Sequence, residues 1–146
     1  MLPHQQTVCR VLLNKSFFSE AALAINSVLT LQVKRLKNEH IIVLVTTASK
    51  EEAETIAQRL LEAKLIACAN IIGPVSSRFL WSGKIDKAEE YLVFLKSRRD
   101  LFGKLSESVK ALHSYEVPEI IAFPVVAGSK TYLDWLDSCL RRSFKG

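Results

Sequence analysis

A two-residue turn, Ser82-Gly83, lies between two long strand-like segments and constrains the fold of this chain more than any other feature. Residues 65–81 precede the turn and residues 84–96 follow it, and both contain runs of apolar, β-branched or aromatic side chains. A turn this short joins strands that run antiparallel. The Gly73-Pro74 pair interrupts the first segment and predicts a bulge or kink there. The sequence therefore predicts a long antiparallel hairpin.

Regular elements are also predicted before and after the hairpin. Residues 41–45 form a continuous apolar run, which is typical of a central strand. Ser49 and Glu52 have the spacing of a capping box, and apolar residues then recur at helical spacing, so a helix is expected over residues 50–63. A second helix is predicted to begin at Asp100, because apolar residues recur at helical spacing after it.

The last third of the chain completes the pattern. Pro118 ends the second helix, and an apolar strand is predicted over residues 120–126, with Pro124 placing it at a sheet edge or a bulge. A short helix is expected over residues 132–140. The order β-α-β-β-α-β folds most readily as a four-stranded antiparallel sheet with two helices on one face. We therefore predict an α+β protein, a ferredoxin-like plait with an extra C-terminal helix.

The apolar strands and the long hairpin also predict association between chains. The strands alternate too little with polar residues for the second face of the sheet to meet water. A hairpin of this length extends beyond a small plait and exposes strand edges. Both observations indicate oligomerisation through sheet faces and strand edges.

The chain divides in composition near residue 40. Residues 1–39 carry five Lys or Arg against two Glu and therefore hold most of the net charge of +5. We expect an N-terminal extension over residues 1–39, either a targeting segment or a loosely packed helix, and one folded domain over residues 40–142. Because the folded part is nearly neutral, no nucleic-acid partner is expected. Charged residues interrupt every apolar run, so no transmembrane segment is expected either.

The cysteines indicate the compartment. Cys9, Cys68 and Cys139 lie far apart with no Cys-x-x-Cys pair, which argues against a zinc ribbon or a disulfide framework. A reducing compartment, the cytoplasm, is therefore expected. A mitochondrial location through the N-terminal extension is the alternative, because an acid-poor start containing Arg and Ser also describes transit peptides.

Several polar side chains gather at the exit of the second helix. His113, Tyr115 and Glu116 offer an imidazole, a phenol and a carboxylate, which are groups used in proton transfer and metal ligation. The alternative interpretation is that they cap the helix and shape the turn. A catalytic His113 should lie within hydrogen-bond reach of a carboxylate in a closed pocket, whereas a structural one should cap the helix.

Five stretches of the sequence carry a family resemblance. They are Leu-Ile-Ala-Cys-Ala-Asn-Ile-Ile at 65–72, Trp-Ser-Gly-Lys-Ile at 81–85, Glu-Tyr-Leu-Val-Phe-Leu-Lys-Ser at 90–97, His-Ser-Tyr-Glu-Val-Pro-Glu-Ile-Ile-Ala at 113–122, and Tyr-Leu-Asp-Trp-Leu at 132–136. In these stretches the chain resembles the CutA family of divalent-cation tolerance proteins. The resemblance covers residues 40 to 140, with Ser114 where the family usually has proline and Ser97 where it has threonine.

This resemblance implies a homotrimer similar in architecture to the PII signalling proteins, with clefts between neighbouring chains. It implies tolerance or binding of Cu²⁺ or another divalent metal ion, a metal-responsive or signalling role, and no enzymatic reaction. A protein partner is implied too, because mammalian relatives are linked to the handling of acetylcholinesterase. The residues carried over as metal ligands are Cys68, Glu90 and His113. Those carried over to the cleft are Trp81, Lys84, Tyr115 and Glu116.

Each assignment has a structural alternative. A cysteine within an apolar strand is often a small core residue, although a thiolate and an imidazole do suit copper or zinc. Trp81 and Tyr115 also suit packing or an interface, and Lys84 also suits protection of a strand edge. The alternative function is a small-molecule enzyme or ligand-binding protein that uses the cleft around His113 and Glu116.

Overall fold

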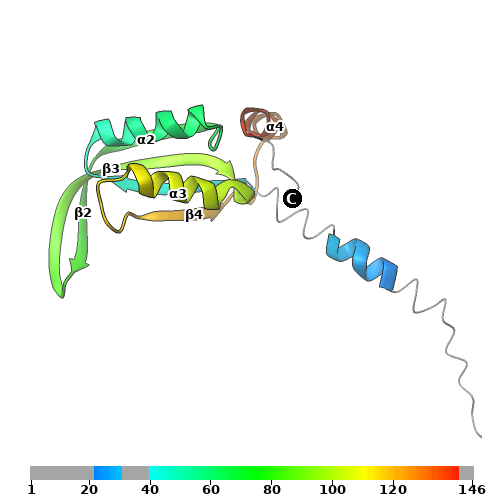
Figure 1. Ribbon diagram of the computed structural model, residues 1–146, viewed down its shortest axis with the longest axis horizontal. Helices are drawn as coiled ribbons and strands as arrows, with labels where there is room; N and C mark the ends of the chain where they lie inside the picture. Colours follow the sequence, from blue (N-terminus) through cyan, green and yellow to red (C-terminus); the bar gives the residue numbers. More distant parts are fainter. Residues whose placement is uncertain (1–21, 31–39, 142–146) are drawn as a thin grey trace, which may run out of the picture. The chain divides into compact units, whose positions relative to one another are not determined.

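The computed structural model describes residues 22–30 and 40–141 of the chain (Figure 1). The chain forms two compact units, Met1–Lys34 and Arg35–Gly146. In the first, residues 22–30 form a short helix with exposed side chains, and the rest of the predicted extension lies outside the described residues. Among the described helices, none combines the length and apolar character needed to span a membrane.

The second unit contains the elements in the predicted order, β-α-β-β-α-β followed by a helix. They are β1 (His40–Thr47), α2 (Lys50–Glu62), β2 (Cys68–Trp81), β3 (Lys84–Arg98), a 3-10 turn (Arg99–Leu101), α3 (Phe102–Leu112), β4 (Ile120–Pro124) and α4 (Lys130–Cys139).

The predicted N-terminal cap of α2 is present, but the Glu52 carboxylate bonds a different backbone N–H from the expected one. The Ser49 hydroxyl accepts a hydrogen bond from the Glu52 N–H at 3.1 Å, as in a capping box. The Glu52 carboxylate accepts from the N–H of Ala48 at 3.0 Å rather than from that of Ser49. The carboxylate therefore bonds one residue further back than expected, and α2 begins at Lys50, as predicted.

The four strands form one antiparallel sheet in the order β2-β3-β1-β4. The mixed α+β class, the long hairpin, the central position of β1 and the edge position of β4 are confirmed. Several boundaries differ from the expected ones; α4, for example, spans Lys130–Cys139 rather than residues 132–140. β2 begins at Cys68 rather than at residue 65, and β4 ends at Pro124 rather than at residue 126. Asp100 lies in the 3-10 turn directly before α3, where its carboxylate binds the Arg98 guanidinium at 3.0 Å.

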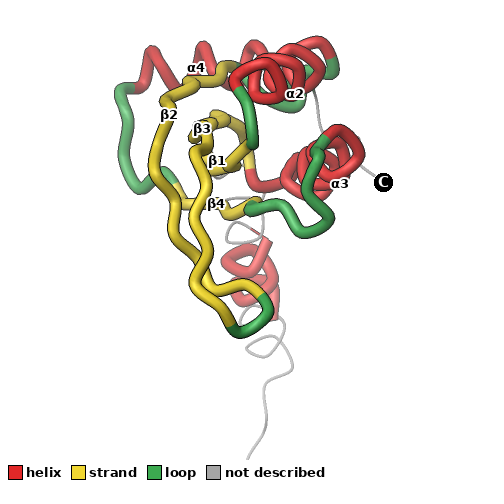
Figure 2. Tube along the Cα trace, turned by 90° about the vertical axis from the view of Figure 1, so that its left-hand side faces the viewer, coloured by secondary structure: helices red, strands yellow, loops and turns green. Residues whose placement is uncertain are grey.

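The core lies between one face of the sheet and the helices α2 and α3, which Figure 2 shows on the same side of the strands. Val43 of β1 pairs with Leu95 of β3 and with Ala122 of β4, so these residues share the helix-facing side. The side chains that fill this layer from both sides are fully buried: Val43, Val45, Val93, Leu95, Ile56, Leu60, Leu105 and Val109.

The opposite face of the sheet is apolar and partly exposed in the described part of a single chain. By strand alternation this face carries Leu44, Phe94, Ile121 and Phe123, and we refer to it as the open face. Phe123 is 51% exposed and Ile121 is 43% exposed. Large exposed apolar patches of this kind mark sites of association.

The last helix, α4, is attached to the sheet by Arg98. The Arg98 guanidinium binds the carboxylates of Asp100 and Asp137 and donates to the carbonyl of Arg141 at 3.1 Å. His40, at the start of β1, lies 3.1 Å from the same Asp137 carboxylate. These polar contacts attach α4 to the sheet, and Leu136 of α4 is buried in the core.

Candidate functional site

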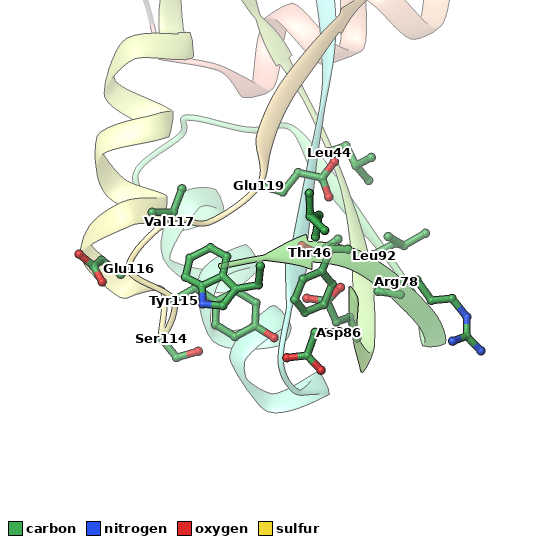
Figure 3. Close-up of a pocket in the computed structure, with 15 residues that line it drawn as sticks. Leu44, Thr46, Arg78, Asp86, Leu92, Ser114, Tyr115, Glu116, Val117 and Glu119 are labelled. Atoms are coloured by element: carbon green, nitrogen blue, oxygen red, sulfur yellow. The ribbon is translucent and has the colours of Figure 1, made fainter. Parts of the chain in front are cut away.

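A cleft of about 870 Å³ opens beside the outer half of the hairpin (Figure 3). Strands β1, β2 and β3 contribute to its walls, and the loop after α3 closes one side. The residues that line it are Leu44, Thr46, Ser77, Arg78, Phe79, Leu80, Trp81, Asp86, Glu90, Leu92, Ser114, Tyr115, Glu116, Val117 and Glu119.

A bulge in β2 determines which hairpin residues share a face with the cleft. Ile72 pairs with Leu92 and Val75 pairs with Glu90, so β2 contains one extra residue between these two pairs. As a result, even-numbered residues of β2 lie on the open face before the bulge and odd-numbered residues after it. Phe79 and Trp81 therefore share the face of Glu90.

Gly73 provides the close approach of strands at this bulge. A Cβ atom at position 73 would lie 2.6 Å from Cδ1 of Tyr91 and 3.0 Å from the carbonyl oxygen of Glu90. A side chain would therefore collide with the opposite strand. This is the physical reason for a glycine in the predicted Gly73-Pro74 interruption.

Glu90 and Tyr115 join the hairpin to the loop after α3. Glu90 is only 6% exposed, and it lies close enough to Tyr115 to act on the pKa of its phenol. Burial raises the pKa of Tyr115 above its ordinary value, and the negative charge of Glu90 raises it further. The phenol therefore keeps its proton at neutral pH.

His113 is buried and both of its ring nitrogens have partners. The backbone N–H of Tyr115 donates to Nδ1 at 3.0 Å, so Nδ1 carries no proton. Nε2 then carries the proton and donates to the carbonyl of Thr46 at 2.7 Å. The nearest carboxylate oxygen, from Glu52, lies 3.8 Å from Nδ1, and the imidazole has no exposed surface. His113 is also the C-cap residue of α3.

Glu52 completes this arrangement from α2. Its Oε1 accepts a hydrogen bond from the backbone N–H of Ser114 at 2.5 Å. Burial acts to raise the pKa of Glu52, but hydrogen bonds from Ser114 and Ala48 outweigh it, so the pKa is lowered from its ordinary value. The carboxylate therefore ties the start of α2 to the loop that borders the cleft.

The structure does not bring the three predicted metal ligands together within one chain. Cys68 lies at the start of β2, where its Sγ is 3.6 Å from the Tyr132 hydroxyl of α4, while Glu90 lies in the cleft wall and His113 is buried behind it. Over residues 22–30 and 40–141, no group of three His, Cys, Asp or Glu side chains is arranged to hold a metal ion.

The four predicted cleft residues are placed unequally. Trp81, Tyr115 and Glu116 belong to the lining, whereas Lys84 pairs with Trp81 at the end of the hairpin and is not part of the lining. Sequence reasoning missed several lining residues, among them Phe79, Asp86 and Glu119. Period-two alternation backward from Glu90 could have found Asp86, but assigning Phe79 requires the size of the bulge.

The geometry defines a small α+β protein whose antiparallel sheet has one face covered by helices and the other bordering an acidic and aromatic cleft. The chain belongs to the CutA1 divalent ion tolerance protein family, whose sequence profile matches residues 41–139.

Individual relatives agree with this assignment. The chain is 48% identical to the divalent-cation tolerance protein CutA of Archaeoglobus fulgidus, over 67% of this chain and 95% of the relative. It is 41% identical to rice protein CutA 1, named chloroplastic, over 70% of this chain and 58% of the relative. The solved divalent cation tolerance protein of Thermus thermophilus superposes with a TM-score of 0.69 at 43% identity, covering 70% of this chain and 99% of that one.

Proposed function

We propose that this protein is a homotrimeric divalent-cation tolerance protein without catalytic activity, acting as a metal-responsive or signalling module in the manner of PII proteins. The observation that carries the proposal is the open face, where Ile121 and Phe123 are about half exposed in a single chain. A second copy would remove this apolar surface from water. The long hairpin extends beyond the sheet core and can contact a neighbouring chain.

The sheet order supports a ferredoxin-like subunit. The order β2-β3-β1-β4, with α2 and α3 on one face, is the arrangement expected when two β-α-β units share one antiparallel sheet. Helix α4 is the addition to this plait.

The geometry of His113 supports the absence of catalysis. His113 is the best acid-base candidate in the sequence, but both of its nitrogens are bonded to backbone groups and the ring is buried. A general base needs a free nitrogen within reach of a substrate. Its position at the end of α3 is that of a structural cap.

A copper or other divalent-metal site is proposed between chains rather than within one. Thiolate and carboxylate donors are suitable for such ions, and Cys68 and Glu90 can supply them, but one described chain gathers no three donors. Using His113 would also break its bond to Thr46. Cys68 and Glu90 from two neighbouring chains would supply several donors without breaking that bond.

Calorimetric titration of the assembled protein with Cu²⁺ tests the metal proposal. Stoichiometric binding that is lost in Cys68→Ala or Glu90→Gln, and kept in the exposed control Glu107→Gln, is the expected result. Light scattering checks that each variant keeps its oligomeric state. Weak binding that is the same in all four proteins would contradict a specific site.

A small-molecule ligand in the cleft is the second candidate function. The observation that favours it is the size of the cleft, about 870 Å³, which is in the range of organic ligand sites and far larger than a metal ion requires. This candidate uses Glu116 and Tyr115 in the lining, with His113 positioning the loop that carries them.

We also propose a cytoplasmic location, with residues 1–39 as the segment that could redirect the chain. Free Cys68 and Cys139 in the described domain are compatible with a reducing compartment. The rice relative is named chloroplastic, so family members differ in location. Fluorescence microscopy of a fusion carrying residues 1–39 tests this: diffuse signal supports the cytoplasm, and organellar signal contradicts it.

A further inference from the structure

Helix α4 depends on its neighbours for stability. It has ten residues, and isolated helices shorter than about 12–15 residues are marginal in water. No side-chain hydrogen bond caps its first turn, and Leu136 is its one buried residue. The attachment of α4 therefore rests largely on its polar contacts with the end of the sheet.

Asp137 is at the centre of these contacts. Its Oδ1 lies 3.1 Å from Nε2 of His40 on β1 and 3.4 Å from Nη1 of Arg98 on β3. Asp137 lies near the end of α4, where the helix dipole disfavours a carboxylate, and the last turn of the helix holds no basic residue. Positive charge supplied by the sheet therefore makes the carboxylate favourable at this position.

Nε2 of His40 lacks a hydrogen bond in this arrangement. The atom is buried, and no hydrogen bond reaches it from the described residues, although the Asp137 oxygen lies 3.1 Å away. On a neutral ring that carries its proton on Nδ1, the lone pair of Nε2 would face the carboxylate oxygen and repel it. A second proton on the ring would replace this repulsion with an ion pair and give the buried nitrogen a partner.

The charged groups around His40 can accommodate an imidazolium. Arg98, its cross-strand partner, opposes a second positive charge. The Arg98 guanidinium, however, makes two hydrogen bonds with the Asp100 carboxylate, at 3.0 Å and 3.2 Å. Val125, which donates to the backbone carbonyl of His40 from the β4 side, carries no charge. Asp100 therefore offsets the charge of Arg98, and Asp137 is left to stabilise a protonated His40.

We propose that α4 is a strap whose hold on the sheet depends on the proton of His40. When His40 is protonated, it forms an ion pair with Asp137 and holds the last turn of α4 against the sheet. When His40 is neutral, the pair is lost and α4 detaches more often. Histidine is the side chain whose charge ordinarily changes between about pH 5 and 8, so the strap responds in that range.

The direction of the pH response follows from the pair. The ion pair exists only while α4 is attached, so its contribution to attachment is present at low pH and is lost as the pH rises. At the other end of α4, the Tyr132 hydroxyl lies 3.6 Å from Sγ of Cys68, so detachment also changes the surroundings of this thiol. All of these contacts lie within one chain, and the strap does not depend on the proposed metal or signalling role.

Hydrogen exchange of the assembled full-length protein, followed by mass spectrometry, tests the strap, because helix amides exchange when the helix detaches. Exchange of residues 130–139 is compared between wild type and His40→Gln at the same pH, so the pH dependence of the chemical exchange step cancels. We expect wild type to exchange about two- to fivefold more slowly at about pH 5.5, and equally fast at about pH 8.5, since a partly exposed ion pair contributes about that factor.

Two variants and an internal reference locate the effect. In the background of Asp137→Asn, His40→Gln should change the exchange of α4 at neither pH. Asp134→Asn, which removes an exposed carboxylate of the same helix, should keep the wild-type response to pH. Exchange in α2 is the internal reference and should be the same in wild type and His40→Gln. A ratio that does not vary with pH, a response that persists in Asp137→Asn, or an equal change in α2 would overturn the proposal.

Discussion

The imidazole of His113 joins two distant parts of the chain through its ring nitrogens. Nε2 donates to the carbonyl of Thr46 near the end of β1, and Nδ1 accepts from the N–H of Tyr115 in the loop that borders the cleft. Glu52 reaches the same loop from α2 through the N–H of Ser114. At the scale of single residues, these polar groups hold the cleft loop in place.

His113→Ala should lower the free energy of unfolding by about 2–4 kcal/mol, since it leaves two buried backbone groups without partners and opens a cavity. Urea unfolding at fixed protein concentration measures the change. Lys110→Ala, an exposed position on α3, serves as the control and should change stability by less than about 0.5 kcal/mol. A similar small change for His113→Ala would contradict the structural role.

Glu52 should make stability depend on acidic pH. Its pKa is lowered in the folded protein, so its ionised form stabilises the fold above the ordinary value of 4.5. As pH falls below 4.5, toward the lowered pKa of the folded state, this contribution is lost. Wild type should therefore be more stable than Glu52→Gln at pH 7, and the difference should shrink as the pH falls.

Thermal unfolding at a series of pH values measures the difference in stability between wild type and Glu52→Gln. Glu107→Gln supplies the baseline for loss of an exposed carboxylate. A difference between wild type and Glu52→Gln that stays constant from pH 7 to below 4 would show that the carboxylate has no linked role.

At the scale of elements, the β2 bulge sets both the packing and the composition of the cleft. The extra residue lies between Ile72 and Val75, where Gly73 passes close to Tyr91 of β3. A bulge adds local twist to a hairpin, so its outer half need not follow the plane of the sheet.

Gly73→Ala should destabilise the protein by about 1–3 kcal/mol, because its Cβ would overlap the Tyr91 ring and the Glu90 backbone. Gly103→Ala in α3 should do the opposite. Nothing lies within 4 Å of a Cβ at that position, so alanine should stabilise the helix by about 0.5–1 kcal/mol. Chemical unfolding of both variants tests the pair, and shifts of the same sign would refute the close-approach account.

The elements themselves could be predicted from local signals, but their junctions could not. The apolar run of β1, the Ser49 cap and the Ser82-Gly83 turn each carry local information. Asp100 resembles a helix start, but it lies in the 3-10 turn Arg99–Leu101 that directly precedes α3. The size of the bulge is likewise a property of the paired strand, so the position of Phe79 could not be derived.

The same distinction applies to the candidate site. The family resemblance implies that Tyr115 and Glu116 border a cleft, and both belong to the lining of the cleft in one chain. The availability of the His113 nitrogens depends on the carbonyl of Thr46, which is remote in sequence. The residue type indicates that His113 can transfer protons or bind a metal. Only the tertiary contacts show that both of its ring nitrogens are already bonded to backbone groups.

At the scale of the whole molecule, the open face is the surface through which we propose that chains associate. Phe123→Asp places a charge in this face and should weaken assembly at least about tenfold, because burial of a phenylalanine contributes about 1.5–3 kcal/mol. Light scattering after size-exclusion chromatography measures the change. The unfolding temperature of wild type should also rise with protein concentration.

Val126→Asp is the matched control for this prediction. Val126 is 94% exposed, and it follows β4 outside the sheet, so an added charge there should leave the mass in solution unchanged. A monomeric wild type, or an unchanged mass for Phe123→Asp, would contradict assembly through the open face.

Strand β3 runs without interruption from Lys84 to Arg98, buried at its far end and exposed near the turn. Val93 and Leu95 hold one half of the strand in the core, whereas the half near Lys84 is exposed to solvent. Glu90 lies close to the buried half, and Lys84 lies roughly 20 Å further along at about 3.3 Å per residue. A slight rotation at Glu90 would therefore move Lys84 much further, because the cleft lies at the base of the exposed outer half of the hairpin.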